Sequence, residues 1–192
     1  MKVRDEAATV WTLPNRLSII RILFIPLIVF FISTQDDGLL LAACLLFIIA
    51  GITDGLDGYL ARKMSLTSRL GLYLDPIADK LLVTSVLITL TYYHQVPLWV
   101  TLILVGREFL INGLRAFYAM EGIAVYPSSA GKIKTALQLT GISFILFNVS
   151  IKRVDVIMNQ IGLVFIYGAL FFSMFSAVNY LTALFRPTSS KQ

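Results

Sequence analysis

The chain reads Thr53-Asp54-Gly55-Leu56-Asp57-Gly58-Tyr59-Leu60-Ala61-Arg62 and, after eight further residues, Gly71-Leu72-Tyr73-Leu74-Asp75-Pro76-Ile77-Ala78-Asp79. Asp54 and Asp57 are spaced i, i+3, and Asp75 and Asp79 are spaced i, i+4, so each pair lies on one face of a helix. Because the connection between the two stretches is short, we expect antiparallel neighbouring helices. The spacing therefore predicts four carboxylates around one cavity.

The sequence around these aspartates is that of an integral membrane protein. Of its 192 residues, 57% are hydrophobic and 14% are charged, with a mean hydropathy of +0.81, whereas soluble domains carry about 25% charged residues. A spanning helix needs about 20 residues, so this length accommodates about six spans and no separate soluble domain. We expect one all-α membrane domain over residues 1–192.

Apolar runs separated by turn signals predict where the six transmembrane helices lie. Residues 1–12 are expected to be a juxtamembrane N-terminal segment, and the short polar stretches between the runs are expected to be loops. The predicted helices are 17–34, 38–61, 71–93, 97–120, 132–151 and 156–184.

The distribution of Lys and Arg predicts the orientation, because basic residues concentrate in cytoplasmic loops. Basic residues precede the first helix, fill the second connection and follow the last helix, whereas the first and third connections have none. Lys152 and Arg153 lie on the opposite side. We expect a multi-pass protein of the cytoplasmic membrane with both termini and the active site facing the cytoplasm, with membrane lipids as partners and no nucleic acid.

Four carboxylates at membrane depth require neutralisation, since one ionised Asp there costs about 2.5–3.5 kcal/mol. Oxygen ligands without a nearby His or Cys favour two divalent ions, Mg²⁺ or Mn²⁺, which bind carboxylates together with substrate phosphates. Gly55 and Gly58 leave room for a phosphate or a base, and Arg62 can contact a phosphate oxygen. The alternative is a buried ion-pair network in which Arg62, Arg69 and Lys80 neutralise the acids, with Gly51 and Gly55 serving helix packing.

The pattern Asp54-x-x-Asp57-Gly58-x-x-Ala61-Arg62, eight residues, Gly71-x-x-x-Asp75-x-x-x-Asp79 resembles the signature of the CDP-alcohol phosphotransferase family. The resemblance implies that family's six-helix fold, CMP as leaving group and two metal ions held by Asp54, Asp57, Asp75 and Asp79. It also implies that Asp79 is the catalytic base. We expect the CDP-lipid donor to be bound by Asp54, Asp57, Gly58, Arg62 and Ser68.

Further stretches extend the likeness over roughly residues 13 to 140. Leu13-Pro14-Asn15-x-Leu17-Ser18-x-x-Arg21 is similar to the family's entry into its first helix. Three later stretches resemble the branch whose acceptor is sn-glycerol 3-phosphate: Arg107-Glu108-Phe109-Leu110, Gly113-Leu114-Arg115 and Gly131-Lys132-x-Lys134-Thr135-x-x-Gln138.

An acceptor that is itself a phosphomonoester needs a cationic site. The predicted phosphate ligands are Arg107, Arg115, Lys132 and Lys134. Arg107 and Arg115 lie about two turns apart on a similar face of one helix, and the two lysines return to that side at the start of the next. The alternative is that Arg107 pairs with a nearby acid and that the lysines are positive-inside anchors.

The predicted reaction transfers the phosphatidyl group of CDP-diacylglycerol to sn-glycerol 3-phosphate. A CMP-forming cardiolipin synthase, whose acceptor is phosphatidylglycerol, shares the metal signature and is an alternative, as is a member that uses inositol phosphate. An ion or proton transporter is the alternative outside enzymes, because intramembrane acids often mark ion pathways. Dimers are common in the family, so a homodimer is one expected assembly.

Overall fold

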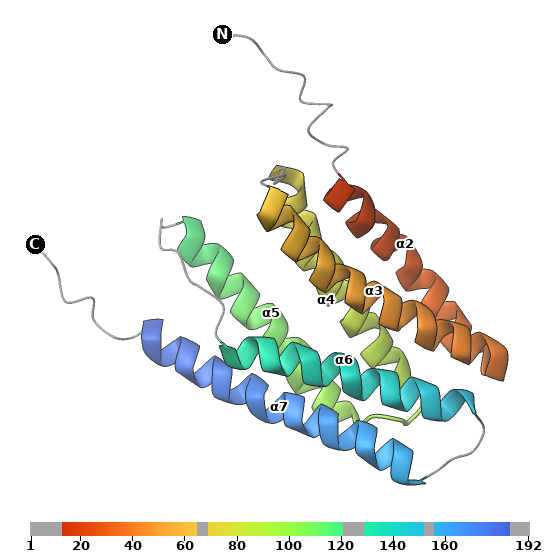
Figure 1. The fold of residues 1–192 in the computed structure, drawn as a ribbon. Coiled ribbons are helices and arrows are strands. Elements are labelled where there is room, and N and C mark those ends of the chain that lie inside the picture. The colour runs from red at the N-terminus through yellow and green to blue at the C-terminus, as the bar shows by residue number, and fades with distance from the viewer. Residues whose placement is uncertain (1–12, 65–68, 121–128, 152–155, 185–192) are drawn as a thin grey trace, which may run out of the picture.

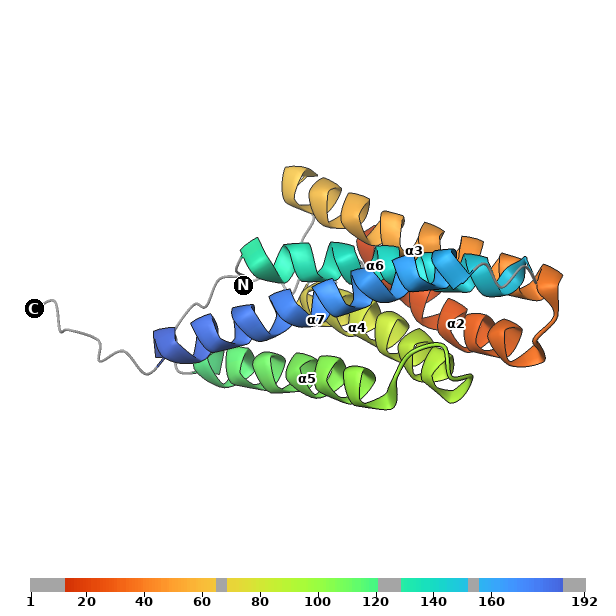
Figure 2. The same cartoon turned by 90° about the horizontal axis from the view of Figure 1, so that it is seen from below.

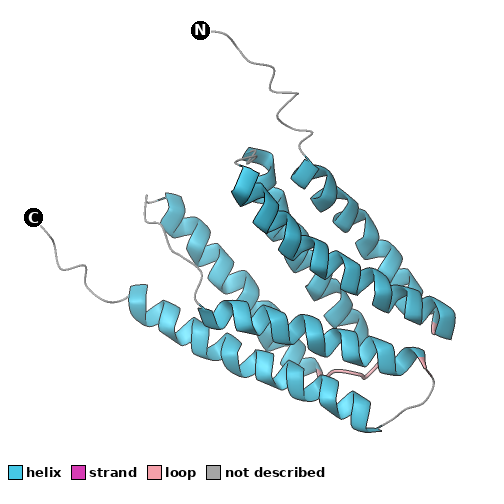
Figure 3. Cartoon of the chain, viewed as in Figure 1, coloured by secondary structure: helices cyan, strands magenta, loops and turns pink. Residues whose placement is uncertain are grey.

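The computed structural model describes residues 13–64, 69–120, 129–151 and 156–184, and within them the chain forms helices and turns without strands. Figure 1 shows consecutive helices running in opposite directions, and Figure 3 shows in pink the described turns and loops, among them 35–36 and 93–97. The described helices are α2 (Leu13–Thr34), α3 (Asp37–Met64), α4 (Arg69–Tyr92), α5 (Leu98–Met120), α6 (Ser129–Ser150) and α7 (Val156–Leu184).

Six helices were expected, and the described residues contain six. The observed helices extend beyond the predicted bounds at α2, which begins at Leu13, at α3, which continues to Met64, and at α6, which begins at Ser129. Lys63 and Met64 have high helix propensity, so the polar composition after Ala61 does not end the helix there. The juxtamembrane segment 1–12 lies outside the described residues.

Individual residues stabilise the two turns that follow α2 and α4, at the end of the bundle remote from the aspartates. The Asp36 carboxylate accepts a hydrogen bond of 3.1 Å from the backbone N–H of Leu39, so Asp36 caps the start of α3. Gln35 and His94 have positive φ values of 55° and 58° and reverse the chain after α2 and α4. The Tyr93 hydroxyl donates to the Ser33 carbonyl over 3.1 Å and joins these turns.

The helices pack so that neighbours in sequence are not always the main neighbours in space. Helix α2 packs against both α3 and α4, and α6 packs against both α3 and α7. Helix α5 lies against α7 and α4 (Figure 2). A hydrogen bond of 2.6 Å between the Thr91 and Thr101 hydroxyls also connects α4 with α5. Helix α4 contacts α3 and α6 as well as α2 and α5.

The apolar core fills the half of the bundle where α2, α4 and α6 end. Phe47, Leu87, Ile145 and Ile166 are completely buried there. Large apolar side chains such as Phe30, Leu102 and Phe171 are exposed on the outer surface, a distribution unlike that of soluble monomers. The protein is therefore a membrane protein whose exposed apolar surface faces lipid.

Three stretches in the described part of the chain are long and apolar enough to span a membrane: Leu17–Thr34, Ser129–Ser150 and Ile157–Val178. A shorter apolar helical segment covers Asp37–Thr53. The remaining helices, α4 and α5, contain charged residues such as Lys80, Arg107 and Glu108, which lower their hydropathy.

Helices α6 and α7 approach each other closely at two glycines. A Cβ atom on Gly141 would lie 2.9 Å from the Gly162 carbonyl oxygen, and one on Gly162 would lie 2.6 Å from Cγ1 of Ile145. The first of these contacts is with a backbone atom and the second is with the inner part of a β-branched side chain, so neither Cβ atom could be added without a shift of the neighbouring helix. The pair therefore resembles the small-residue contacts that let helices pack in lipid.

We predict that Gly162→Ala destabilises the protein, because the added methyl group forces α6 and α7 apart and overpacking typically costs about 1–3 kcal/mol. The midpoint of thermal unfolding in detergent should fall. Gly106→Ala is the matched control, since a Cβ atom added at Gly106 on α5 would have no neighbour within 4 Å, and Ala in a helix is favoured by about 1 kcal/mol over Gly. An unchanged midpoint for Gly162→Ala would contradict the close contact.

Candidate active site

The predicted site residues lie on the half of the bundle opposite the apolar core. Asp54 and Asp57 are in the second half of α3, and Asp75 and Asp79 are in the first half of α4. Because α4 is helical throughout 69–92, Asp75 and Asp79 are about one helical turn apart in it.

Several predicted donor and metal ligands lie outside what the structure describes. Ser68 belongs to the connection 65–68. At Asp54, Asp57, Gly58, Arg62 and Asp75 the backbone is helical but the surroundings of the residues are not described. Among the described residues, no three His, Cys, Asp or Glu side chains form a group able to hold a metal. The arrangement of the four aspartates therefore stays a prediction.

Asp79 is described, and it is partly buried beside a cavity of about 440 Å³ formed by α3, α4, α5 and α6. The cavity brings together residues that are far apart in the sequence. Five basic side chains and two carboxylates line it, so its described lining has a formal excess of three positive charges. These residues are Asp79, Lys80, Arg107, Glu108, Arg115, Lys132 and Lys134.

All four predicted acceptor cations line this cavity together with Asp79. Arg107 and Arg115 come from the middle and the later part of α5, and Lys132 and Lys134 come from the first two turns of α6. The expectation that the two helices place these residues on the same side therefore agrees with their positions. An anionic group that enters this cavity would therefore lie close both to the cations and to the Asp79 carboxylate.

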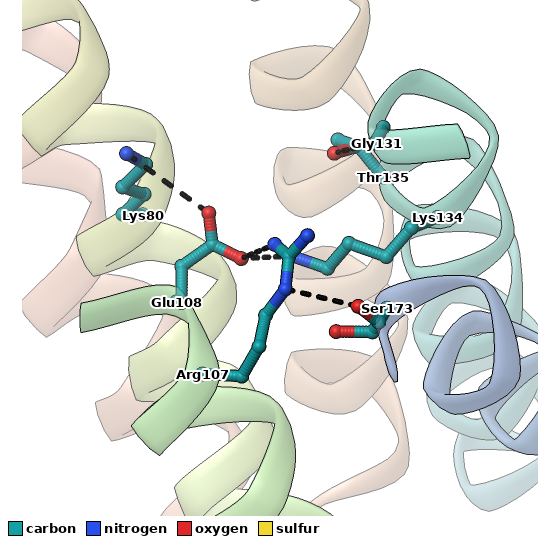
Figure 4. A network of polar contacts seen from close by, with 7 residues as sticks. All are labelled: Lys80, Arg107, Glu108, Gly131, Lys134, Thr135 and Ser173. Atoms are coloured by element: carbon teal, nitrogen blue, oxygen red, sulfur yellow. Dashed lines mark hydrogen bonds and ion pairs between the residues drawn. The ribbon is translucent and has the colours of Figure 1, made fainter. Parts of the chain in front are cut away.

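The four cations differ in their surroundings. Lys134 is only 5% exposed, and its ammonium group contacts Oε2 of Glu108. Arg107 lies with Nη1 3.5 Å from the same oxygen, and its Nε donates to the Ser173 carbonyl over 3.2 Å. Lys80 of α4 approaches the other oxygen, Oε1, at 3.9 Å. Figure 4 shows the three basic side chains converging on Glu108.

Arg115 and Lys132 have no ion pair within the part of the chain that the structure describes. The Arg115 guanidinium carbon lies 5.6 Å from the centre of the Tyr180 ring, a cation–π contact that orients it. Lys132 is exposed at the start of α6. Of the four predicted acceptor cations, Arg115 and Lys132 are thus the two that lack an acidic partner among the described residues.

Arg107 does pair with a nearby acid, which was the alternative to a phosphate ligand. The pair does not exclude the ligand role, because a guanidinium has five N–H groups and only two of them contact Glu108 and Ser173 here. The alternative that Lys134 is only a surface anchor does not fit a side chain that is almost completely buried. An interfacial anchor would extend towards water.

Sequence reasoning missed the importance of Glu108. The residue belongs to a stretch that resembles the family, but the pattern assigned no role to it. A signal was present, because a carboxylate in the middle of an apolar helix requires a partner. Neighbouring polar residues that also border the polar region, Asn112, Thr135 and Gln138, were likewise not assigned roles.

A second, mostly apolar cavity of about 330 Å³ adjoins the first between α3 and α6. Gly51 and Leu139 line both cavities. Phe47, Ile52 and Phe144 are among the other residues of the apolar cavity. A molecule with a charged end and an apolar end could therefore occupy the two cavities at once.

The aspartate signature, the helical bundle and the charged cavity together define an enzyme class. The chain belongs to the CDP-alcohol phosphatidyltransferase family, which it matches over residues 11–175. The family resemblance inferred from the aspartate pattern is thereby confirmed.

Relatives with assigned activities cover nearly the whole chain. A CDP-diacylglycerol–glycerol-3-phosphate 3-phosphatidyltransferase from Bacillus subtilis is 36% identical over 185 residues, 90% of this chain and 94% of the relative. The enzyme of the same name from Rickettsia bellii is 36% identical over 171 residues, 89% of this chain and 94% of the relative. That from Shigella flexneri serotype 5b is 32% identical over 179 residues, with 90% and 94% covered.

The family implies divalent metal ions, and the donor chemistry at the cavity fits them. Asp79 supplies carboxylate oxygens at the cavity wall, and Asp75 precedes it by about one turn in α4. The described cavity lining contains no His or Cys that would favour a softer metal. Carboxylate ligands beside a cavity able to hold phosphate groups are the usual setting for Mg²⁺ or Mn²⁺.

Proposed function

We propose that this protein transfers the phosphatidyl group of CDP-diacylglycerol to sn-glycerol 3-phosphate, forming phosphatidylglycerol phosphate and CMP. The observation that carries the proposal is the cavity in which Asp79 and all four predicted acceptor cations meet. An acceptor with one reacting hydroxyl and one phosphate requires a base for the hydroxyl and cations for the phosphate in the same cavity. The activity of the relatives supports the same acceptor.

In the proposed reaction, the acceptor hydroxyl attacks the β-phosphorus of CDP-diacylglycerol and the bond to the CMP oxygen breaks. Asp79 accepts the hydroxyl proton as the new phosphorus–oxygen bond forms. Arg107, Arg115, Lys132 and Lys134 hold the acceptor phosphate, which orients the hydroxyl towards the donor. CMP leaves with the electron pair of the broken bond, and phosphatidylglycerol phosphate remains.

The donor is expected to lie on the α3 side of the cavity. Asp54, Asp57, Gly58, Arg62 and Ser68 are the proposed CDP-lipid ligands, and Asp54, Asp57, Asp75 and Asp79 are the proposed ligands of two Mg²⁺ or Mn²⁺ ions. When bound, such ions neutralise the diphosphate and the charge that develops during in-line displacement. The apolar cavity next to Gly51 suits a hydrocarbon chain of the donor.

We further propose that all six helices span the cytoplasmic membrane as a single domain, with the cavity on the cytoplasmic side. The bundle end at which α3 ends and α4 begins carries Arg62, Lys63 and Arg69, whereas the turns 35–36 and 93–97 carry no Lys or Arg. This bias supports the orientation under the positive-inside rule. Both the soluble acceptor and the CDP headgroup could then enter from the cytoplasm.

Purified protein should release CMP from CDP-diacylglycerol when sn-glycerol 3-phosphate and Mg²⁺ or Mn²⁺ are present. Excess EDTA should abolish turnover and added metal should restore it, since the carboxylates alone would repel the diphosphate. Acceptors offered one at a time test the assignment. Conversion of phosphatidylglycerol to cardiolipin without use of glycerol 3-phosphate would replace it, and full activity in chelator would reject the metal site.

Asp79→Asn should lower kcat by a factor of about 10² or more, the range expected when a general base is removed. The variant should remain folded, because Asn is isosteric and avoids burying a charge. Thermal unfolding and metal titration should accompany the assay, since Asp79 is also a proposed metal ligand. Near-normal turnover in a folded, metal-saturated variant would assign the base to another residue.

Lys132→Ala and Arg115→Ala should each raise KM for sn-glycerol 3-phosphate by about 10- to 150-fold, the equivalent of one charge-assisted hydrogen bond of about 1.5–3 kcal/mol. These two residues are chosen because neither has an acidic partner among the described side chains. KM for CDP-diacylglycerol should change by less than about threefold, provided that chemistry is slow enough for KM to follow binding. A parallel rise in both constants would place the two cations at the donor site instead.

A further inference from the structure

Glu108 is a partly buried carboxylate on which basic side chains from three helices converge, and the proposed reaction gives it no role. Its side chain is 20% exposed and lies between Lys80 of α4, Arg107 of its own helix α5, and Lys134 of α6. Figure 4 shows that the three cations approach Glu108 from different sides. All four residues line the cavity that also contains Asp79.

The contacts leave hydrogen-bond donors available on the cations. An ammonium group has three N–H bonds and a guanidinium has five. Lys134 donates to Glu108, and Arg107 donates once to Glu108 and once to the Ser173 carbonyl. Each can therefore keep its contact with Glu108 and still donate to a phosphate.

Burial makes the contact with Glu108 necessary for the position of these cations. Lys134 and Arg107 have side chains only 6% and 10% exposed. A buried cation without a partner is expensive, so it moves towards water when its carboxylate is removed. Glu108 thus determines whether the two cations stay at the cavity wall.

We propose that Glu108 is a positioning residue for the acceptor: it holds Lys134 and Arg107 in place for the phosphate of sn-glycerol 3-phosphate. Through Lys80 it also connects this phosphate site on α5 and α6 with α4, the helix that carries Asp79. The inference rests on the proposed function, because it assumes that the acceptor has a phosphate group. It assigns no contact between Glu108 and the substrate.

A purely electrostatic effect of Glu108 would have the opposite sign. A carboxylate beside a dianionic phosphate repels it, so neutralising the carboxylate would strengthen acceptor binding if charge alone mattered. If Glu108 positions the cations, neutralising it weakens acceptor binding. The direction of the change in KM therefore separates the two effects.

The test uses Glu108→Gln in the full-length protein. KM for sn-glycerol 3-phosphate should rise by about tenfold or more, the loss expected for a weakened charge-assisted hydrogen bond, while KM for CDP-diacylglycerol stays within about threefold. Stabilisation of the protein by sn-glycerol 3-phosphate in thermal unfolding should weaken at equal concentration. An unchanged or lowered KM for the acceptor in folded Glu108→Gln would overturn the inference.

Asp36→Asn is the matched control. It also removes one carboxylate charge, but at the far end of the bundle, and Asn caps a helix about as well as Asp. Both KM values should stay at the wild-type level in this variant. An equal rise of the acceptor KM in Asp36→Asn would assign the effect to net charge and overturn the positioning role.

A double-mutant cycle with Lys134→Gln tests whether Glu108 acts through the lysine. The double variant should lose little more acceptor affinity than Lys134→Gln alone, because residues that act together are not additive. Full additivity would overturn the inference. If Glu108→Gln does not fold, Glu108→Asp decides: it keeps the charge but withdraws the oxygens, so the acceptor KM should again rise, and an unchanged KM would overturn the role.

The two proposals fail in different ways. A wild-type protein that releases no CMP with sn-glycerol 3-phosphate overturns the proposed function. A wild-type protein that uses this acceptor, with Glu108→Gln equally efficient towards it, overturns the positioning role alone.

Discussion

The pairing of charges inside an apolar bundle is the constraint on which the rest of this structure depends. A charged group at membrane depth is expensive unless a partner or an ion neutralises it. The described side chains meet that requirement by placing Glu108 among Lys80, Arg107 and Lys134. The cluster in turn requires α4, α5 and α6 to approach at one end of the bundle, so the fold and the polar cavity are not independent.

The other half of the bundle provides the rigidity that such a cluster needs. Phe47, Leu87 and Ile145 are completely buried, and the glycine contact between α6 and α7 fixes the direction of α6. Since Lys134 is near the start of α6, the packing of the later residues of that helix determines where the lysine lies. Arg107 is fixed from the opposite side by the Ser173 carbonyl of α7. Helix α7 therefore supports the site from outside the cavity.

The sequence was sufficient to predict the features that depend on local residue patterns. Apolar runs of spanning length predicted six helices because the hydrocarbon thickness dictates their length, and the spacing of Arg107 and Arg115 by about two turns predicted that both would reach one cavity. The difference between Lys132 and Lys134 was not predictable in this way. Residues two positions apart diverge on a helix, and the burial of Lys134 depends on the helices that pack around α6 and on its contact with Glu108 of α5. The role of Glu108 likewise depends on partners on two other helices.

The two adjoining cavities differ in the polarity of the residues that line them. The polar cavity reaches the exposed Lys132, whereas the cavity beside Phe47 and Phe144 is mostly apolar. Gly51 and Leu139 separate them, and a Cβ on Gly51 would lie only 3.2 Å from Leu139. A side chain at this position would therefore narrow the connection between the polar cavity and the apolar cavity. In the proposed reaction, the lipid-linked donor would occupy both cavities and the soluble acceptor only the polar one, so the glycine at position 51 would leave room for the donor between them.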